Sequence, residues 1–163
     1  TRSVEEVGYV CDVFNEAGKI VKAAGIPFGY HNHDFEFAKV LPGGKEAVFG
    51  RHNKGEKIYD LFLKDTDPDL VFFEMDVYWT VIGQNDPVEY MKKYPNRIKL
   101  LHIKDRAILG QSGFMNFEMI FKQAYQIGVK EYYVELEGMP DGRTQFDGIK
   151  GCADYLLKAK FVK

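Results

Sequence analysis

Cysteine, excess charge and long apolar runs are all scarce in this sequence, and each shortage excludes a class of protein. The two cysteines, Cys11 and Cys152, lie near opposite ends and form no CxxC pair, so we interpret them as small core residues rather than a disulfide framework. Lys and Arg number 22 against 24 Asp and Glu, a net charge of −2, without a basic stripe. Nucleic acid is therefore not an expected partner.

Membrane and targeting segments are missing as well. No apolar stretch approaches the roughly 18 residues that a membrane span needs, so we expect no membrane partner. Residues 1–6 do not resemble a signal peptide, and the sequence leaves both the cytoplasm and the periplasm open as the compartment. Because the chain starts without Met, we expect further residues upstream in the parent protein.

The chain does contain enough apolar material for a folded core. Hydrophobic residues make up 45% and aromatic residues 15% of its 163 positions. No linker, internal repeat or low-complexity segment divides it. We therefore expect one domain over residues 1–163.

Helix-like and strand-like segments alternate along this domain. Ser3, with Glu6 three residues later as its reciprocal partner, predicts a capped helix that stops at Gly25. Asp86 and Pro87 predict the start of another helix. The predicted helices span residues 4–24, 58–64, 87–94, 114–127 and 146–160, and the predicted strands span residues 26–31, 70–76, 98–103 and 131–136.

This alternation indicates an α/β fold of parallel strands joined by right-handed crossovers. A complete (β/α)8 barrel takes about 250 residues, so the chain is shorter by roughly half. The pattern by itself leaves two architectures open, an open α/β sheet and half of a barrel.

Metal-type side chains stand at the C-terminal ends of all four predicted strands. These ends converge on one mouth in a parallel barrel, so distant residues can meet around one ion. Two imidazoles and two carboxylates suit Mn²⁺, Zn²⁺, Co²⁺ or Fe²⁺ better than Ca²⁺ or Mg²⁺. Strand alternation places Glu74 on the same face as Asp76, and Glu137 on the same face as Glu135. Asp76 is the better ligand of its pair because it lies nearer the mouth. Glu74 is expected either to pair with a cation deeper in the barrel or to lie against the base of the site.

Four motifs in this order resemble the xylose-isomerase-like sugar phosphate isomerase/epimerase family. They are residues 25–37 (GIPFGYHNHDFEF), 74–79 (EMDVYW), 101–105 (LHIKD) and 134–135 (VE), and they match strands five to eight of that family. The resemblance implies the C-terminal half of a (β/α)8 TIM barrel with four parallel strands. It also implies one divalent metal ion held by His31, Asp76, His102 and Glu135.

Further residues of the motifs are expected to act on the substrate. We expect Glu135, Lys104, His33 and Glu36 to carry protons, in that order of preference. We expect Trp79, His33, Asn32 and Arg106 to bind the substrate, with Trp79 as a flat platform for the C–H face of a sugar. For Lys104, a purely structural ion pair with a nearby carboxylate is expected as readily as a role in proton transfer. Arg97 is expected to be structural, and the loop 110–113 lacks the ending of a phosphate-binding loop.

The family resemblance implies a metal-dependent sugar or cyclitol isomerase or epimerase that removes a proton next to a carbonyl. Its well-known epimerases use paired glutamates from strands five and eight, whereas this chain has His31 at the strand-five position. Elimination from a keto-sugar or inosose is therefore the alternative reaction, and carbohydrate binding without turnover is a third reading. The net charge argues against the apurinic-endonuclease relatives of the fold.

Half of a barrel also has consequences for assembly. Four strand-plus-helix units leave two sheet edges without neighbours. We therefore expect the chain to associate with itself, and to bind substrate weakly because part of the pocket wall is absent.

Overall fold

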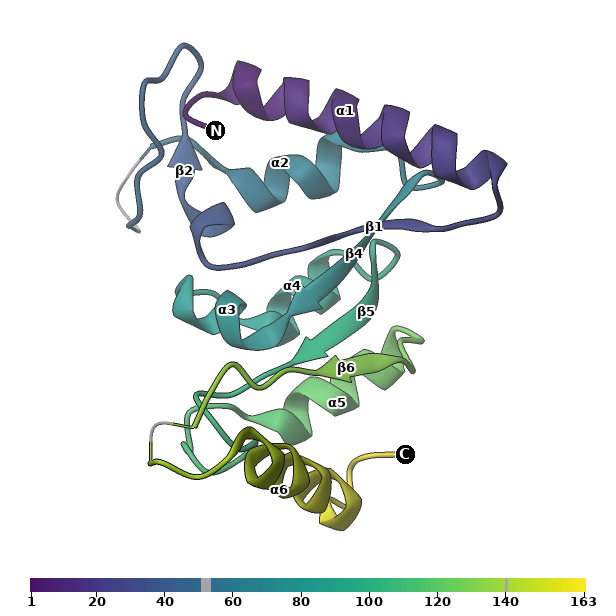
Figure 1. Ribbon diagram of the computed structural model, residues 1–163. Helices are drawn as coiled ribbons and strands as arrows, with labels where there is room; N and C mark the ends of the chain where they lie inside the picture. Colours follow the sequence, from purple (N-terminus) through teal and green to yellow (C-terminus); the bar gives the residue numbers. More distant parts are fainter. Residues whose placement is uncertain (51–53, 140) are drawn as a thin grey trace.

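The computed structural model describes residues 1–50, 54–139 and 141–163. Its main sheet has four parallel strands in the order β1-β4-β5-β6 (Figure 1). Their bounds are Phe28–His31 for β1, Val71–Asp76 for β4, Ile98–Ile103 for β5 and Tyr132–Val134 for β6. All four predicted strands are confirmed, and the two outer ones are shorter than expected.

Helices connect the strands as the sequence predicts. Their bounds are Val4–Ala23 for α1, Ile58–Asp65 for α2, Val77–Ile82 for α3, Pro87–Lys93 for α4, Phe117–Gln126 for α5 and Gln145–Lys158 for α6. A short 3-10 helix η1 (Phe35–Phe37) and an antiparallel pair, β2 (Lys39–Val40) with β3 (Glu56–Lys57), follow β1. Helix α3, η1 and the β2–β3 pair are additions that the sequence pattern did not predict.

The helix caps confirm most of the predicted start positions. The Ser3 hydroxyl accepts from the Glu6 N–H at 3.2 Å, but the predicted reciprocal bond is wrong, because the Glu6 carboxylate accepts from the N–H of Arg2 at 2.8 Å instead. Helix α5 begins at Phe117 rather than at residue 114. The reason is Asn116, whose side chain accepts from the Met119 N–H and caps the helix.

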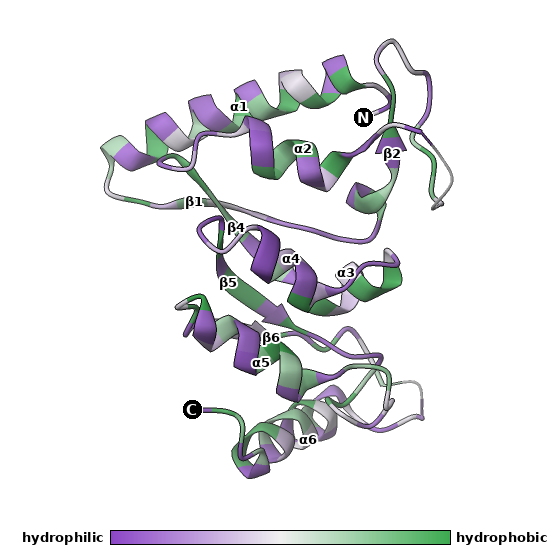
Figure 2. Ribbon diagram, turned by 180° about the vertical axis from the view of Figure 1, so that it is seen from behind, coloured by the Kyte–Doolittle hydropathy of each residue, from purple (hydrophilic) through white to green (hydrophobic). Residues whose placement is uncertain are grey.

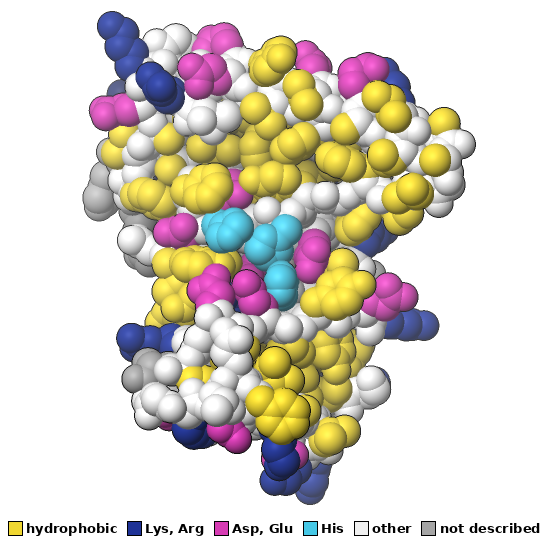
Figure 3. Space-filling model, in the orientation of Figure 1, with side chains coloured by type: hydrophobic (Ala, Val, Ile, Leu, Met, Phe, Trp, Pro, Cys, Tyr) yellow, Lys and Arg dark blue, Asp and Glu magenta, His cyan; other side chains and the backbone are white. Residues whose placement is uncertain are grey.

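The helices cover one face of the sheet and leave the other face open. Helices α4 and α5 lie behind the strands in Figure 1 and in front of them in Figure 2, where their apolar stripes turn toward the sheet. Phe73, Met75 and Ile103 point into this layer and have no exposed surface. Polar side chains of the same strands point to the opposite face, which Figure 3 shows with the histidines gathered at its centre.

None of the helices in the described part of the chain is long and apolar enough to cross a membrane.

Candidate metal centre

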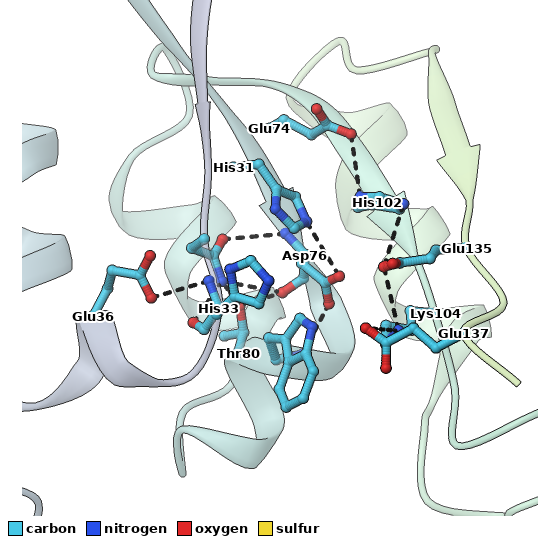
Figure 4. Close-up of polar contacts among 12 residues, drawn as sticks. His31, His33, Glu36, Glu74, Asp76, Thr80, His102, Lys104, Glu135 and Glu137 are labelled. Atoms are coloured by element: carbon cyan, nitrogen blue, oxygen red, sulfur yellow. Dashed lines mark hydrogen bonds and ion pairs between the residues drawn. The ribbon is translucent and has the colours of Figure 1, made fainter. Parts of the chain in front are cut away.

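The four predicted metal ligands meet on the open face, at the C-terminal ends of the strands (Figure 4). His31 ends β1, Asp76 ends β4, and His102 is paired in register with Asp76 from β5. Glu135 follows β6, and its N–H donates to the carbonyl of Ile103 at 3.1 Å. One ligand atom from each side chain lies within 4.8 Å of the others. The sheet register therefore places the ligands together.

The distances in this cluster fit a single divalent ion. The Nε2 of His31 lies 3.3 Å from Oδ2 of Asp76, and the Nε2 of His102 lies 3.6 Å from Oε2 of Glu135. The rings of His31 and His102 are 4.7 Å apart. Two imidazole nitrogens and two carboxylate oxygens at this spacing are a ligand set for a borderline cation, whose bonds to these atoms are about 2.0–2.2 Å.

Asp76 is held in place from three sides. Its carboxylate accepts from the N–H of Trp79 at 2.8 Å and so caps helix α3, while the other oxygen faces His31. Its own N–H donates to Oδ1 of Asn32 at 3.1 Å. Asp76 has no exposed surface. Because the cap, the strand pairing and the buried amide all act on one residue, its carboxylate has a single position.

Asn32 lies behind the ligands rather than in the open mouth. Its side chain is completely buried, and its Nδ2 lies 3.4 Å from the Thr80 hydroxyl and 3.5 Å from the carbonyl of Asp76. Both ends of the amide are thus engaged by the turn between β4 and α3. These contacts hold Asp76 and the start of α3 in place, and the substrate contact expected of Asn32 from the sequence stays a prediction.

A carboxylate lies beneath His102, as expected for Glu74. Its Oε1 is 3.4 Å from Nδ1 of His102, a buried atom that has no hydrogen-bond partner among the described residues. The contact is therefore an ion pair in distance without hydrogen-bond geometry. Metal-binding histidines commonly donate their other N–H to a carboxylate, which sets the tautomer and the ring orientation.

The charges of the cluster act on His31. Burial by itself lowers the pKa of its imidazole, but the hydrogen bond and charge of Asp76, with the charges of Glu74 and Glu135, raise that pKa overall. The carboxylates therefore favour a cation at this point, whether it is a proton or a metal ion.

Lys104 joins the cluster from the far side of Glu135. Its ammonium lies 3.3 Å from Oε2 of Glu135 and 3.0 Å from Oε1 of Glu137, and the residue is only 2% exposed. It also lies 5.6 Å from the ring centroid of Trp79. The structure thus brings two of the predicted proton carriers, Lys104 and Glu135, into contact.

The structure places Glu36 away from the ligands. Its carboxylate accepts from the Tyr30 hydroxyl at 2.5 Å and from the His33 N–H at 3.0 Å, and it has no exposed surface. Burial raises the pKa of Glu36 and of the Tyr30 phenol. In Figure 4 it lies on the far side of His33 from the other acids. Glu36 supports the loop that carries His33.

The loop after β5 is organised by Asp105, a residue whose role the sequence analysis missed. Its buried carboxylate accepts from the N–H groups of Arg106 and Gly110 and from the hydroxyl of Ser112, at 2.7, 3.0 and 2.5 Å. Two donors of the loop 110–113, the Gly110 N–H and the Ser112 hydroxyl, are thus engaged by Asp105. An Asp followed by a Gly/Ser-rich loop was the available signal. Arg106 itself is exposed.

The aromatic residues of the motif lie beside the ligands. The His33 ring is 5.1 Å from that of His31 and 5.6 Å from that of Trp79. The Nε1 of Trp79 is buried without a hydrogen-bond partner in the described part of the chain. At the opposite end of the sheet, Arg97 donates to the carbonyl of Thr66 at 2.9 Å, the structural role expected for it.

Comparison with the sequences of curated proteins finds inosose dehydratases among the relatives of this chain. No protein-family model matches the chain. An inosose dehydratase of Clostridium tetani is 32% identical over 91 residues, which are 56% of this chain and 26% of that protein. An inosose dehydratase of Geobacillus thermodenitrificans is 25% identical over 145 residues, 89% of this chain and 43% of that protein. The chain spans less than half the length of these curated relatives.

Solved structures resemble the chain over its whole length. Two structures described as sugar phosphate isomerase/epimerase from Parabacteroides distasonis match all of it. The first has a TM-score of 0.90 and 61% sequence identity, and the chain covers 57% of its length. The second has a TM-score of 0.93 and 56% sequence identity, and the chain covers 56% of its length. An L-ribulose 3-epimerase shares the fold, with a TM-score of 0.61 at 16% identity over 97% of this chain and 59% of its own.

These matches decide between the two architectures that the sequence left open. The four strands and their helices align with TIM-barrel proteins and leave the remainder of each neighbour unmatched. The open face of the sheet is therefore a barrel interior. The chain is thus similar, at high identity, to sugar phosphate isomerase/epimerase proteins of the xylose-isomerase-like kind, and it has the fold of one half of their (β/α)8 barrel.

Proposed function

We propose that this chain carries the metal-binding and proton-transferring side chains of a sugar isomerase or epimerase, which acts by removing a proton next to a carbonyl. The observation that carries the proposal is the convergence of His31, Asp76, His102 and Glu135 within 4.8 Å at the mouth of the half-barrel. The enzymatic relatives of the chain act on sugars or cyclitols by their names, which supports a small carbohydrate as the substrate.

The four side chains would hold one divalent ion, with Mn²⁺, Zn²⁺, Co²⁺ and Fe²⁺ as the candidates. A bound ion would supply Lewis-acid polarisation of the substrate carbonyl. Asn32 holds the backbone of Asp76, and Glu74 faces the outer nitrogen of His102, so both keep ligands in place. These two residues are positioning residues in this proposal.

Glu135 is the proposed base. Its side chain is 31% exposed, so a carbon-bound proton can reach the carboxylate, while the buried Lys104 ammonium lies 3.3 Å from its Oε2. That ammonium stabilises the negative charge that forms beside the carbonyl and can return a proton. His33 is the next candidate for proton transfer, with Trp79 and Arg106 as substrate contacts.

Elimination is the second candidate reaction, and one observation favours it. The curated relatives described above are inosose dehydratases. In addition, this chain has His31 at the position where paired-glutamate epimerases have the base that acts on the opposite face of the substrate. In this reaction, Glu135 takes the same proton, and the hydroxyl group on the next carbon leaves as water after it accepts a proton from Lys104. Binding of a carbohydrate without turnover is the third reading.

Solvent hydrogen exchange tests the proposal. The Mn²⁺-loaded chain is incubated with a panel of keto-sugars and inososes in D₂O, and proton NMR follows the hydrogen next to the carbonyl. Glu135→Gln should slow exchange by about 10² to 10⁴-fold, because it removes a general base. Metal binding by this variant should fall less than exchange does.

Controls separate the alternatives. Glu137→Gln removes the other carboxylate on Lys104 and should leave most of the exchange intact. Wild-type exchange in Glu135→Gln would assign the base to Lys104 or His33. A dehydrated product would establish elimination, whereas bound metal without exchange on any member of the panel would leave carbohydrate binding as the function.

A further inference from the structure

A continuous row of aromatic rings borders the proposed metal site, and the ligands do not account for it. Neighbouring rings in the row are 5.8, 5.6, 5.3 and 6.5 Å apart between centroids. The members, in order, are Phe35, His33, Trp79, Tyr78 and Phe114. His33 lies in the loop after β1, Phe35 begins η1, Trp79 and Tyr78 lie in helix α3, and Phe114 lies in the loop after β5. We call this set the aromatic row.

The aromatic row starts at the ion-binding cluster and leads away from it in two directions. Its inner members contact the site, since the rings of His33 and His31 are 5.1 Å apart and the Lys104 ammonium lies 5.6 Å from the Trp79 ring. Its two ends are the phenylalanines, which are 55% exposed for Phe35 and 49% for Phe114. Exposed apolar side chains that are continuous with a binding site indicate a surface that contacts a ligand.

Two buried carboxylates hold the loops that carry these ends. Glu36, next to Phe35, accepts from Tyr30 and from the backbone of His33. On the other side, the hydroxyl of Ser112 accepts from the N–H of Phe114 at 3.0 Å and donates to Asp105. Burial of a carboxylate is unfavourable unless it is hydrogen-bonded, so the two carboxylates hold these segments in one conformation. In that conformation both phenylalanines are exposed to solvent.

We propose that the aromatic row is a carbohydrate subsite, which binds a second sugar unit beyond the one that reaches the metal site. This deepens the proposed function and rests on it, because it names a disaccharide or glycoside as the substrate class. Sugar rings stack their C–H faces on aromatic planes. The Phe35 and His33 rings provide such a plane, because they stack with only 11° between them. The donors of the nearby loop are taken by Asp105, so a phosphate has no equivalent place there.

The single tryptophan makes this testable without any turnover. Trp79 lies in the middle of the aromatic row, and its fluorescence reports ligand binding directly. Titrations of the Mn²⁺-loaded chain compare glucose with maltose and cellobiose, and galactose with lactose. At least one disaccharide should bind about 3 to 10-fold more tightly than its monosaccharide, the size expected for one or two aromatic contacts.

Variants of the exposed ends assign this gain to the row. At least one of the variants Phe35→Ala and Phe114→Ala should reduce the disaccharide preference and leave monosaccharide binding within twofold, because the second sugar unit stacks at one end of the row. Phe146→Ala is the matched control, since this phenylalanine is 77% exposed on α6, and it should change neither affinity. Because all three side chains are exposed, the variants are expected to fold, which far-UV circular dichroism checks.

Two outcomes overturn the subsite. In the first, no disaccharide binds more tightly than its monosaccharide. In the second, a disaccharide binds more tightly but keeps this preference in both Phe35→Ala and Phe114→Ala. Failure of the proposed function is distinguishable, because it appears as missing deuterium exchange. A disaccharide preference that depends on Phe35 or Phe114 in a chain without exchange supports the subsite and rejects the chemistry.

Discussion

At the scale of single residues, Asp76 combines three tasks that are usually separate. It ends a strand, caps the next helix and supplies an oxygen to the candidate metal centre. Replacement with Ala removes the cap and the ligand together, so a measurement of metal binding needs a second ligand variant to separate the two effects.

We predict that Asp76→Ala and His102→Ala both abolish stoichiometric binding of Mn²⁺ or Zn²⁺ in isothermal titration calorimetry. Each variant loses one of four ligands. Glu74→Gln is the graded control: it keeps all four ligands but weakens the orientation of His102, so affinity should fall about 10 to 100-fold with the stoichiometry preserved. Unchanged stoichiometry in both alanine variants would refute the ligand set.

Glu36 supports a prediction about pH and stability. Its pKa in the folded chain is raised by burial above the ordinary value of 4.5, so the folded state keeps this proton to higher pH than the unfolded state does. This contribution is fully present below pH 4.5 and is lost as the pH rises through the raised pKa. The free energy of unfolding should therefore decline over that window relative to a variant without the group.

Glu36→Gln provides that variant. Urea unfolding from pH 4 to pH 7 should give a difference in the free energy of unfolding, wild type minus variant, that decreases as the pH rises. Gln cannot accept both hydrogen bonds, from Tyr30 and from the His33 backbone, so the variant is expected to be less stable overall. A difference that stays constant with pH would show that Glu36 has the same pKa in both states.

At the scale of elements, helix α1 contains a matched pair of glycines. A Cβ at Gly18 would meet the carbonyl oxygen and Cβ of Leu70 at distances of 2.6 and 3.0 Å, whereas a Cβ at Gly8 meets nothing within 4 Å. At Gly18 the helix therefore lies directly against Leu70, the residue before β4. Gly8 has no such constraint.

We predict opposite effects of Ala at these two positions. Gly8→Ala should raise the free energy of unfolding by about 0.5–1 kcal/mol, because Ala is the better helix former. Gly18→Ala should lower it by about 1–3 kcal/mol, because the helix must move off the backbone of Leu70. Urea denaturation of both variants measures the pair, and stabilisation by Gly18→Ala would show that the helix adjusts freely.

Helix α3 shows why a short element escapes sequence reasoning. Its six residues directly follow β4 without a turn, so the apolar pattern of the strand continues into the helix. The cap is Asp76, a residue that also fits the end of a strand. Local pattern alone cannot divide such a run. The contacts at the boundary are the Asp76 N–H, which donates to Asn32 from the segment after β1, and the Asp76 carbonyl, which accepts from the Thr80 hydroxyl within α3.

At the scale of the whole molecule, the open face and the two outer strands govern behaviour. In the described chain, β1 pairs only with β4 and β6 only with β5, so each has one unpaired edge. Phe146, Ile149 and Leu157 form an exposed apolar stripe on α6, at 77%, 58% and 85% exposure. Both features favour association.

We predict that the 163-residue chain, expressed by itself, self-associates, with a two-fold pair of half-barrels as one arrangement. Light scattering combined with size-exclusion chromatography over a range of concentrations measures this. Replacement of Leu157 by Lys should weaken the association if the α6 stripe takes part. A soluble monomer at all concentrations, with full activity, would contradict the prediction.

The sequence by itself determined the order of the four main strands, the helix caps at Ser3 and Asp86, and the positions of the four candidate ligands. Such features depend on short-range patterns, on strand alternation and on motifs that a family resemblance reads directly. His31, Asp76, His102 and Glu135 could be named because each lies at the end of an apolar run, and parallel strands bring such ends together.

Only the tertiary structure decided what the neighbouring side chains do. Glu36 and Lys104 both follow strand ends, yet Glu36 is buried and hydrogen-bonded to Tyr30, whereas Lys104 forms an ion pair with Glu135. Asn32 supports Asp76 from behind, and Asp105 organises the next loop. The physical reason is that burial and hydrogen-bond partners depend on residues from other elements, which lie 45 positions apart for His31 and Asp76 and 48 for Asn32 and Thr80. No local sequence pattern contains pairs so far apart.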